Sequence, residues 1–539
     1  MKKLTKTLAS TLATLLVLPS ITACGPTSNN NVIIDKNKTQ VYFQSYAGGF
    51  GHDWALELAA RFNEKQPADG IQAIVLDPTK DDVVFIAESI KAGTAVADIW
   101  QYQPTLARYI RQGLLMDITD VYNSESDNGV TIKNKIRDLD EFDSAVKYQE
   151  KYYMLPWNEG LILPIADYEL FTARDWLIKD EQGNLSVGND GKPGTYDDGM
   201  PVTMEEWDEM VANIASAGDV SPFINSNTYN FYTEHILNTV WAMYDGKANY
   251  RAATSFNGNY TSPTTGDVTA LNSENGYLAY EIAEGREKAI SEFAYYYFNK
   301  NYLHPDSLKT SSHTDAQATF VMGSVDSSIK KSAMLFDGIW WENESHSLFN
   351  SIGSYGTHDY RMMLLPQIDG GVEDPDGNGT AGGSIVTALE NNVLFAKAQT
   401  DQKKETAVKE FMKYLVSDEA LGIYISMTGA MVPYKFNLST PQYDNLTKFG
   451  KSVYNIYSDT ENVAILRPVM YEQSSEMCTL AQPSAYMWGN IDAANGQSYS
   501  NPWAAFVNGN MTAEGVISGL KANYTQAKWQ TMLNSLPKD

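Results

Sequence analysis

The sequence predicts an α/β fold with two lobes, on three observations. Residues 39–102 alternate short strands with helices, a pattern typical of parallel strands joined by helical crossovers. The apolar passage 152–164 is extended and interrupted by prolines, as expected where a chain crosses between lobes, and we place the first crossing near Pro156. Residues 334–336 form a predicted buried strand, which the turn pair Asp337-Gly338 closes. A chain of 539 residues is long enough for two large lobes.

Residues 1–23 predict an export signal, because lysines precede an apolar run at 8–18 and small residues follow it. The ending Ile21-Thr-Ala-Cys24 resembles the lipobox of bacterial lipoproteins, in which cleavage precedes the cysteine and its thiol is lipidated. Two or more acyl chains anchor a protein durably to a membrane. A chance cysteine in an ordinary secretory signal is the alternative. Residues 24–38, polar and without periodicity up to Asn31, are expected to form a flexible tether.

Composition excludes some classes of partner and leaves others open. The formal net charge of −26 argues against nucleic acid and against anionic lipid as binding partners. Only Cys478 accompanies Cys24, so a lipidated chain has no intramolecular disulfide and depends on its core for stability. No other segment approaches the length of a membrane span. The aromatic content of 12% suits carbohydrate contact and a large core equally well.

The first lobe is predicted to open with a βαβ arrangement. Strands are expected at 39–43, 71–76 and 97–100, with helices at 52–66 and 83–92 between them. The glycine-rich loop 45–51 lacks the dinucleotide spacing and has no following Lys-Ser or Lys-Thr, which disfavours a nucleotide site. Glycine at these positions instead allows backbone to approach a ligand closely, with Tyr46 and Phe50 as apolar walls.

A turn-dense insertion at 180–203 is the candidate metal site. Carboxylates and amides clustered among glycines are the ligands that calcium prefers. Their spacing does not match an EF-hand, so solvated turns are the alternative. The candidate ligands are Asp180, Asn184, Asn189, Asp190, Asp197 and Asp198. Thr203 is expected to cap the helix that follows. His313 and Asp315 give a weaker metal hint, because the chain has only six histidines.

Two adjacent tryptophans follow the strand that ends at Gly338. Open α/β sheets present ligand-contacting side chains in the crevice at their strand ends. Trp340, or alternatively Trp341, is therefore predicted to be a stacking platform for a small ligand. The alternative is that both indoles belong to the core, since tryptophan is highly buried on average.

Several segments occur in a characteristic order along the chain. They are the export signal with its lipobox, Ala97–Trp100, Met154–Pro156, Ser332–Trp340, Gly382–Ser384, the helical segment 406–416 and Gly429–Pro433. In this order they resemble family 1 extracellular solute-binding proteins, the maltose-binding-protein-like carbohydrate receptors of bacterial ABC importers. Two departures stand out. Ile339 occupies a position where many members have proline, and the chain is longer than is typical, through the insertion and the C-terminal tail.

The resemblance implies a type II periplasmic-binding-protein-like fold, with a ligand cleft between lobes that close about a hinge. It places 39–156 with 383–435 in lobe 1, and 157–382 with 436–539 in lobe 2. The implied function is an extracytoplasmic, lipid-anchored receptor, monomeric and without catalysis or required cofactor, that delivers a mono- or oligosaccharide to an importer. The implied site residues are Tyr46, Phe50, Gln101, Tyr102, Gln103, Trp157, Asn227, Tyr229, Trp241 and Trp340, and Trp341 stays a candidate from the strand-end pattern alone.

The physical requirements of sugar binding agree with these residue types. A sugar has apolar CH faces and a rim of hydroxyls, so its receptor needs flat aromatic rings and side chains that donate or accept hydrogen bonds. An oligopeptide-binding lipoprotein and a lipid-anchored glycoside hydrolase are the alternatives, since aromatic and carboxylate side chains suit both. No triad, nucleophile elbow or zinc-binding helix motif supports an enzyme.

Overall fold

The computed structural model describes residues 33–535, apart from 47, 80–82, 103–106, 141–145, 230, 299–300, 310, 378–383, 389–391 and 468–487. The predicted export signal, the lipidation candidate Cys24, the tether up to residue 32 and the site candidate Gln103 lie outside the described residues. In the part that is described, no helix has the length and apolar character needed to cross a membrane.

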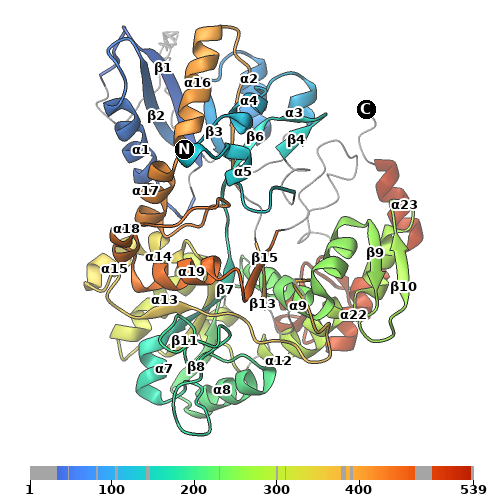
Figure 1. Cartoon of the computed structure of the whole chain (residues 1–539). Coiled ribbons are helices and arrows are strands. Elements are labelled where there is room, and N and C mark those ends of the chain that lie inside the picture. Colours follow the sequence, from blue (N-terminus) through green and yellow to red (C-terminus); the bar gives the residue numbers. More distant parts are fainter. Residues whose placement is uncertain are drawn as a thin grey trace, which may run out of the picture.

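Lobe 1 is built on a five-stranded sheet in the order β2-β1-β3-β14-β6 (Figure 1). Its strands are β1 (Thr39–Tyr46), β2 (Ile71–Thr79), β3 (Ile99–Tyr102), β6 (Met154–Asn158) and β14 (Asn392–Ala396). β1 is parallel to β2 and β3, whereas β14 is antiparallel to β3 and β6. The main helices are α1 (Asp53–Glu64), α2 (Val83–Lys91), α16 (Gln402–Leu415) and α17 (Asp418–Thr428). The predicted βαβ opening is confirmed.

The core of lobe 1 follows from the apolar spacing in its first strand and helix. Alternate residues of β1 are buried, and the Phe43 ring packs edge-on against Trp54 of α1 and Phe411 of α16, at 5.9 and 6.1 Å. On α1 the buried residues Trp54, Leu58 and Phe62 recur every four positions, which places them on one helical face. This face therefore fixes α1 against the sheet and leaves the loop before it at the edge facing lobe 2.

Lobe 2 is built on a four-stranded sheet in the order β12-β7-β11-β8. Its strands are β7 (Ile162–Asp167), β8 (Val220–Ile224), β11 (Lys331–Gly338) and β12 (Tyr360–Met362). Its helices are α7 (Tyr168–Arg174), α8 (Met204–Ser216), α13 (His313–Val325), α14 (Trp341–Glu344), α15 (His346–Ile352) and α19 (Lys448–Ser458). The predicted strand before Gly338 is confirmed, and Thr203 caps α8 through a reciprocal capping box with Glu206.

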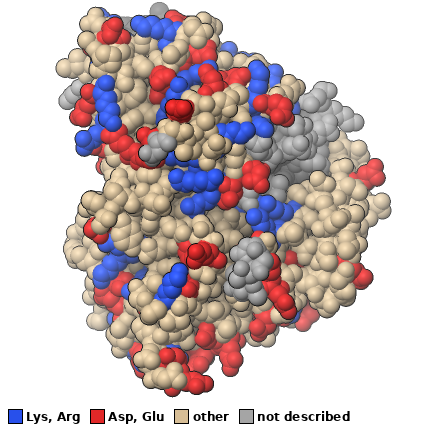
Figure 2. Space-filling view, in the orientation of Figure 1, with Lys and Arg blue, Asp and Glu red and all other residues tan. Residues whose placement is uncertain are grey.

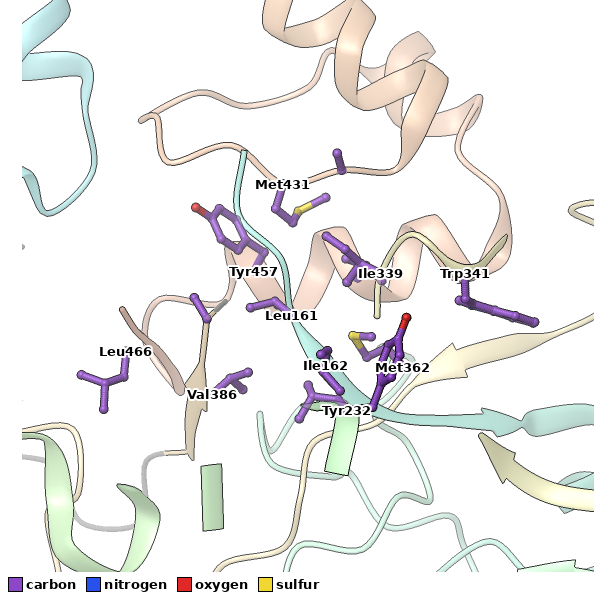
Figure 3. Packing of buried hydrophobic residues seen from close by; sticks show 14 of the residues in the cluster. Leu161, Ile162, Tyr232, Ile339, Trp341, Met362, Val386, Met431, Tyr457 and Leu466 are labelled. Atoms are coloured by element: carbon purple, nitrogen blue, oxygen red, sulfur yellow. The ribbon is translucent and has the colours of Figure 1, made fainter. Parts of the chain in front are cut away.

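The crossings between the lobes lie side by side. The chain passes from β6 to β7 through residues 159–161, where Glu159 pairs with Met431 and Leu161 pairs with Ala388 in isolated bridges. Figure 3 shows Leu161 and Ile162 on this crossing. The sequence-based division groups 383–387 with lobe 1, whereas β13 (Ser384–Thr387) pairs with β15 (Val463–Leu466) and contacts a lobe 2 helix, α9 (Phe231–Ser255).

A helical module extends lobe 2 at the lower right of Figure 1. It contains α9, the hairpin β9 (Gly258–Thr261) and β10 (Val268–Leu271), η2 (Gly276–Leu278), α10 (Ala279–Ile282), α11 (Glu284–Lys288), η3 (Ala289–Ala294), α12 (Tyr295–Tyr297), β16 (Ile491–Asp492), β17 (Ser498–Tyr499), α21 (Pro502–Val507), α22 (Ala513–Ala522) and α23 (Gln526–Ser535). Among the described residues after 487, α21, α22 and α23 are helices, and Trp488, Trp503 and Trp529 are buried.

The remaining elements of the described residues are short. They are α3 (Ala107–Arg111), α4 (Thr119–Asn123), η1 (Asp127–Gly129), α5 (Ile132–Lys135), β4 (Lys147–Tyr148), β5 (Lys151–Tyr152), η4 (Pro305–Leu308) and α18 (Thr440–Asp444).

On the face shown in Figure 2, acidic side chains gather at the lower end, in lobe 2. This distribution agrees with the net charge of −26 and gives that face no continuous basic surface for nucleic acid.

Candidate functional site

The Trp340 side chain marks the junction of the two lobes. It lies two residues after the end of β11 at Gly338 and is half-buried. A Cβ atom at Gly338 would collide with the Trp340 indole, so glycine is needed for the ring to lie over the strand end. A Cβ atom at Gly49, in the first loop of lobe 1, would fall 2.8 Å from both Trp340 and Glu344. Two glycines, one from each lobe, thus allow backbone to approach this ring closely.

Aromatic side chains from both lobes meet at Trp340. Phe50 of lobe 1 lies edge-on to the indole with ring centroids 6.3 Å apart. Tyr232, at the start of α9, lies 6.1 Å from the indole by ring centroid, and its hydroxyl accepts a hydrogen bond from Trp340 Nε1 at 3.3 Å. Phe231 stacks on Tyr232 at 4.2 Å. The predicted site residues Phe50 and Trp340 are therefore brought together, with Tyr232 as an additional neighbour.

A second aromatic pair stands at the strand ends of lobe 1. The Tyr46 and Tyr102 rings pack at right angles with centroids 5.2 Å apart, and Tyr46 is 37% exposed. Gln101 is buried, accepts the Tyr46 backbone N–H at 3.3 Å and donates to Asn158 Oδ1 at 3.3 Å. Gln101 therefore holds the loop in place, while Tyr46 presents the exposed ring.

On lobe 2, Tyr229 and Asn227 have different roles. Tyr229 is 43% exposed and packs edge-on against His313 of α13 at 4.7 Å. Asn227 accepts the backbone N–H of Ser311 at 3.1 Å, which ties the loop after β8 to the segment before α13. Tyr229 thus offers an accessible ring, and Asn227 stabilises the loop that carries it.

A buried polar cluster lies behind the aromatic rings. Gln317 of α13 donates to Asp337 at 3.0 Å and to Glu344 at 2.7 Å, and accepts from the Ser345 hydroxyl at 3.1 Å. His313 lies 3.7 Å from Glu344. Burial raises the pKa of Asp337 well above its usual range and also raises the pKa of Glu344. The cluster therefore holds Glu344 in a fixed position and provides hydrogen-bonding groups beside the rings.

Two partly buried titratable groups at the start of α9, Glu234 and His235, make the stability of the fold depend on pH. Burial raises the pKa of Glu234 to about 8 and lowers the pKa of His235 to about 4. An acid whose pKa is higher in the folded than in the unfolded state stabilises the folded protein at pH values below its unfolded pKa. This stabilisation is lost as the pH rises through the folded-state pKa. The lowered pKa of His235 changes the free energy of unfolding only below about pH 6.5.

Between pH 6.5 and 8 the unfolding free energy should therefore fall by about 1 kcal/mol through Glu234, half of the full linkage to allow for its partial exposure. Glu342, whose pKa burial raises to about 7, acts in the same direction. Urea denaturation at the two pH values measures this difference. Glu234→Gln should flatten the dependence, and a variant with an unchanged slope would contradict the assignment.

Three predicted site residues lie in the core instead, which corrects their assignment as ligand contacts. Trp341 is enclosed by Phe320, Phe349, Tyr360 and Phe449, with centroids 5.1–5.7 Å away. Trp157 packs between Trp54 and Tyr424, at 5.4 and 4.8 Å. Trp241 donates from Nε1 to the buried Asp245 at 2.7 Å. All three indoles are fully buried, so none can stack on a solute in this conformation.

The oxygen ligands predicted in the insertion are engaged in local turns. Asp180 accepts the backbone N–H groups of Gln182 and Asn184 at 2.9 and 2.8 Å. Asp197 accepts those of Asn189 and Asp190 at 2.6 and 3.1 Å. Among the described residues, no group of three or more His, Cys, Asp or Glu side chains is placed to hold a metal ion. The calcium site remains a prediction from the sequence pattern.

A separate groove of about 350 Å³ lies in lobe 1, away from Trp340. Gln44, Leu76 and Trp100 of adjacent strands face it, and α2 forms its outer wall through Phe85, Ile86 and Ser89. None of the predicted ligand contacts lines this groove.

Sequence reasoning missed the polar partners of the site, although a local signal was present. Gln317 follows His313 by four residues on α13, and Glu344 follows Trp340 by four. Residues four apart share one helical face, so these pairs could have been grouped. Tyr232 had only its position in a polar and aromatic loop segment to indicate it.

Comparison with known proteins gives one sequence family and many structural relatives. The family of bacterial extracellular solute-binding proteins matches residues 57–446. No curated protein sequence matches the chain.

Three of the similar structures illustrate the likeness. A chitin oligosaccharide binding protein has 15% identity and a TM-score of 0.56, over 92% of this chain and 100% of that one. RafE from Streptococcus pneumoniae, in complex with raffinose, has 13% identity and a TM-score of 0.53, over 91% and 99%. A structure concerned with xylan utilization by the thermophilic bacterium Caldanaerobius polysaccharolyticus has 15% identity and a TM-score of 0.54, over 90% and 100%. At these identities the likeness shows the fold.

Proposed function

Because the chain belongs to the family of bacterial extracellular solute-binding proteins, we propose that it binds a mono- or oligosaccharide between its lobes and delivers it to an ABC importer. The observation that carries this proposal is the arrangement at Trp340, where a half-buried indole of lobe 2 faces Phe50 of lobe 1 beside the Glu344 carboxylate. Flat rings suit the CH faces of a sugar, and carboxylate and amide groups suit its hydroxyl rim.

The structural relatives support a saccharide as the solute. Among them are a chitin oligosaccharide binding protein and RafE in complex with raffinose, which have the same fold as this chain. Receptor binding needs no chemical step, and we propose that the solute leaves the protein unchanged. We further propose, from the lipobox-like sequence, that Cys24 carries a lipid and that the receptor is a monomer attached to the membrane through that lipid alone.

A thermal-shift screen of the chain without residues 1–24 tests the proposal. At least one mono- or oligosaccharide should raise the melting temperature, because a ligand at a hundred times its Kd stabilises the folded state by about 2.7 kcal/mol. Oligopeptides serve as the matched series. A shift with peptides alone, or release of smaller sugars from an oligosaccharide by the pure protein, would replace the proposal with one of its alternatives.

A further inference from the structure

A buried ion pair occupies the crossing between the lobes. Glu159 and Arg467 are both fully buried. The Arg467 guanidinium donates from Nη2 to Glu159 Oε2 at 3.0 Å and from Nε to Glu159 Oε1, so the pair is bidentate. Breaking such a pair by removing one partner is strongly destabilising, because a buried charge is left uncompensated. The pair therefore strongly favours one arrangement of the segments that carry it.

Those segments belong to the hinge. Glu159 lies between β6 of lobe 1 and β7 of lobe 2, and its backbone N–H donates to Met431, in another segment at the lobe junction, at 2.9 Å. Arg467 directly follows β15, which pairs with β13. Figure 3 shows Met431 and Tyr457 near Leu161 on the crossing, with Val386 and Leu466 on the neighbouring strands. The ion pair thus links two chain segments at the pivot.

Side chains from each lobe extend this link. Asp138 of lobe 1 accepts a hydrogen bond from Arg467 Nη1 at 2.9 Å. Tyr457 of α19, which packs on β12 of lobe 2, donates through its hydroxyl to Glu159. Arg137 of lobe 1 donates to the Tyr457 carbonyl at 2.9 Å, and its guanidinium lies 4.6 Å from the Tyr457 ring centroid. Rotation of one lobe relative to the other must therefore strain or break these contacts.

The same arrangement brings the ligand-site surfaces together. Gly49 and Phe50 of lobe 1 contact Trp340 of lobe 2, and Asn343 of α14 donates to the Thr428 carbonyl at the end of α17. The contacts at the hinge and those at Trp340 therefore belong to one conformation, in which the lobes are close at the site. Any contact present only in this conformation raises its population and the apparent affinity of a solute that requires it.

We propose that Arg137, Asp138, Glu159, Tyr457 and Arg467 are positioning residues that hold the lobes at the angle in which Phe50 meets Trp340, and so set the solute affinity. The inference rests on the proposed receptor function for its affinity component only. The angle between the two lobes in the solute-free protein does not depend on the receptor function.

The variant that tests this proposal is Asp138→Asn. The Asp138 side chain is 53% exposed, and its φ of 49° is one that asparagine adopts readily, so the substitution removes the charge with little risk to folding. The matched control is Asp175→Asn, also at positive φ (58°), exposed, and paired with Lys179 rather than with the hinge. Glu159→Gln is a second, stronger variant at the hinge itself.

Small-angle X-ray scattering and saccharide titration give the two readouts. Asp138→Asn should increase the radius of gyration of the solute-free protein and weaken saccharide binding about fivefold, while the saturated complex regains the wild-type radius. Glu159→Gln should also increase the solute-free radius of gyration and weaken saccharide binding. Asp175→Asn should change neither the radius nor the affinity. A solute-free radius for Asp138→Asn equal to that of the control would overturn the proposal. If wild-type protein binds no saccharide, the proposed receptor function is wrong. The scattering comparison still tests whether these residues hold the angle between the lobes.

Discussion

Replacing Trp340 with alanine should weaken saccharide binding by about ten- to hundredfold, as expected for a central aromatic anchor. The indole is half-buried and stands where both lobes meet, so its loss removes the stacking surface and the partner of Phe50. The free energy of unfolding should change by only about 1–2 kcal/mol, because the ring is not part of the closed core. Isothermal titration calorimetry and urea denaturation measure the two quantities.

Trp340→Phe is the matched control for this experiment. It keeps an apolar ring but loses the N–H that donates to Tyr232, so it should retain most of the affinity that the alanine variant loses. An alanine variant that binds saccharide as tightly as wild type would remove Trp340 from the site.

Replacing Trp341 with alanine should lower the free energy of unfolding by about 3–5 kcal/mol, the range for a buried aromatic truncated in a closed core. The indole has no exposed surface and is surrounded by four aromatic rings, so the neighbours cannot close the space left behind. The midpoint of urea denaturation measures the loss.

Comparing the alanine variants of Trp340 and Trp341 separates an effect on saccharide affinity from an effect on stability. The Trp341 variant, where it remains folded, should bind saccharide with affinity within about threefold of wild type, since the ring does not face the site. A strong loss of affinity in folded Trp341→Ala with little change in stability would reverse the roles of the two residues.

Much of the fold could be predicted because its signals are local. Trp54, Leu58 and Phe62 recur at helical spacing, and the strand ending at Gly338 is short, apolar and closed by a turn. The proline-interrupted passage 152–164 and the family resemblance both predicted the two-lobe architecture, which the structural relatives confirm. The pairing of β13 with β15 could not be predicted, because residues 384 and 463 are brought together only by the folded chain.

The site was harder to predict than the fold. A tryptophan's identity does not reveal which way its ring points, and Trp157, Trp241 and Trp340 differ only in what the tertiary structure places around them. The polar partners have the same difficulty: Gln317 reaches Glu344 across 27 positions of the sequence. Such contacts depend on how α13 packs beside β11, which no local pattern encodes.

The glycines on either side of Trp340 also bear on how solute specificity could evolve. With Gly338 beneath the indole and Gly49 against its Cβ, the ring has little freedom to rotate, so little rotamer entropy is lost when a solute stacks on it. A preset ring contributes stacking affinity to any sugar that presents an apolar CH face to it. Discrimination between sugars would then fall to the surrounding hydrogen-bonding side chains, and substitutions there could redirect the receptor while its anchor stayed constant.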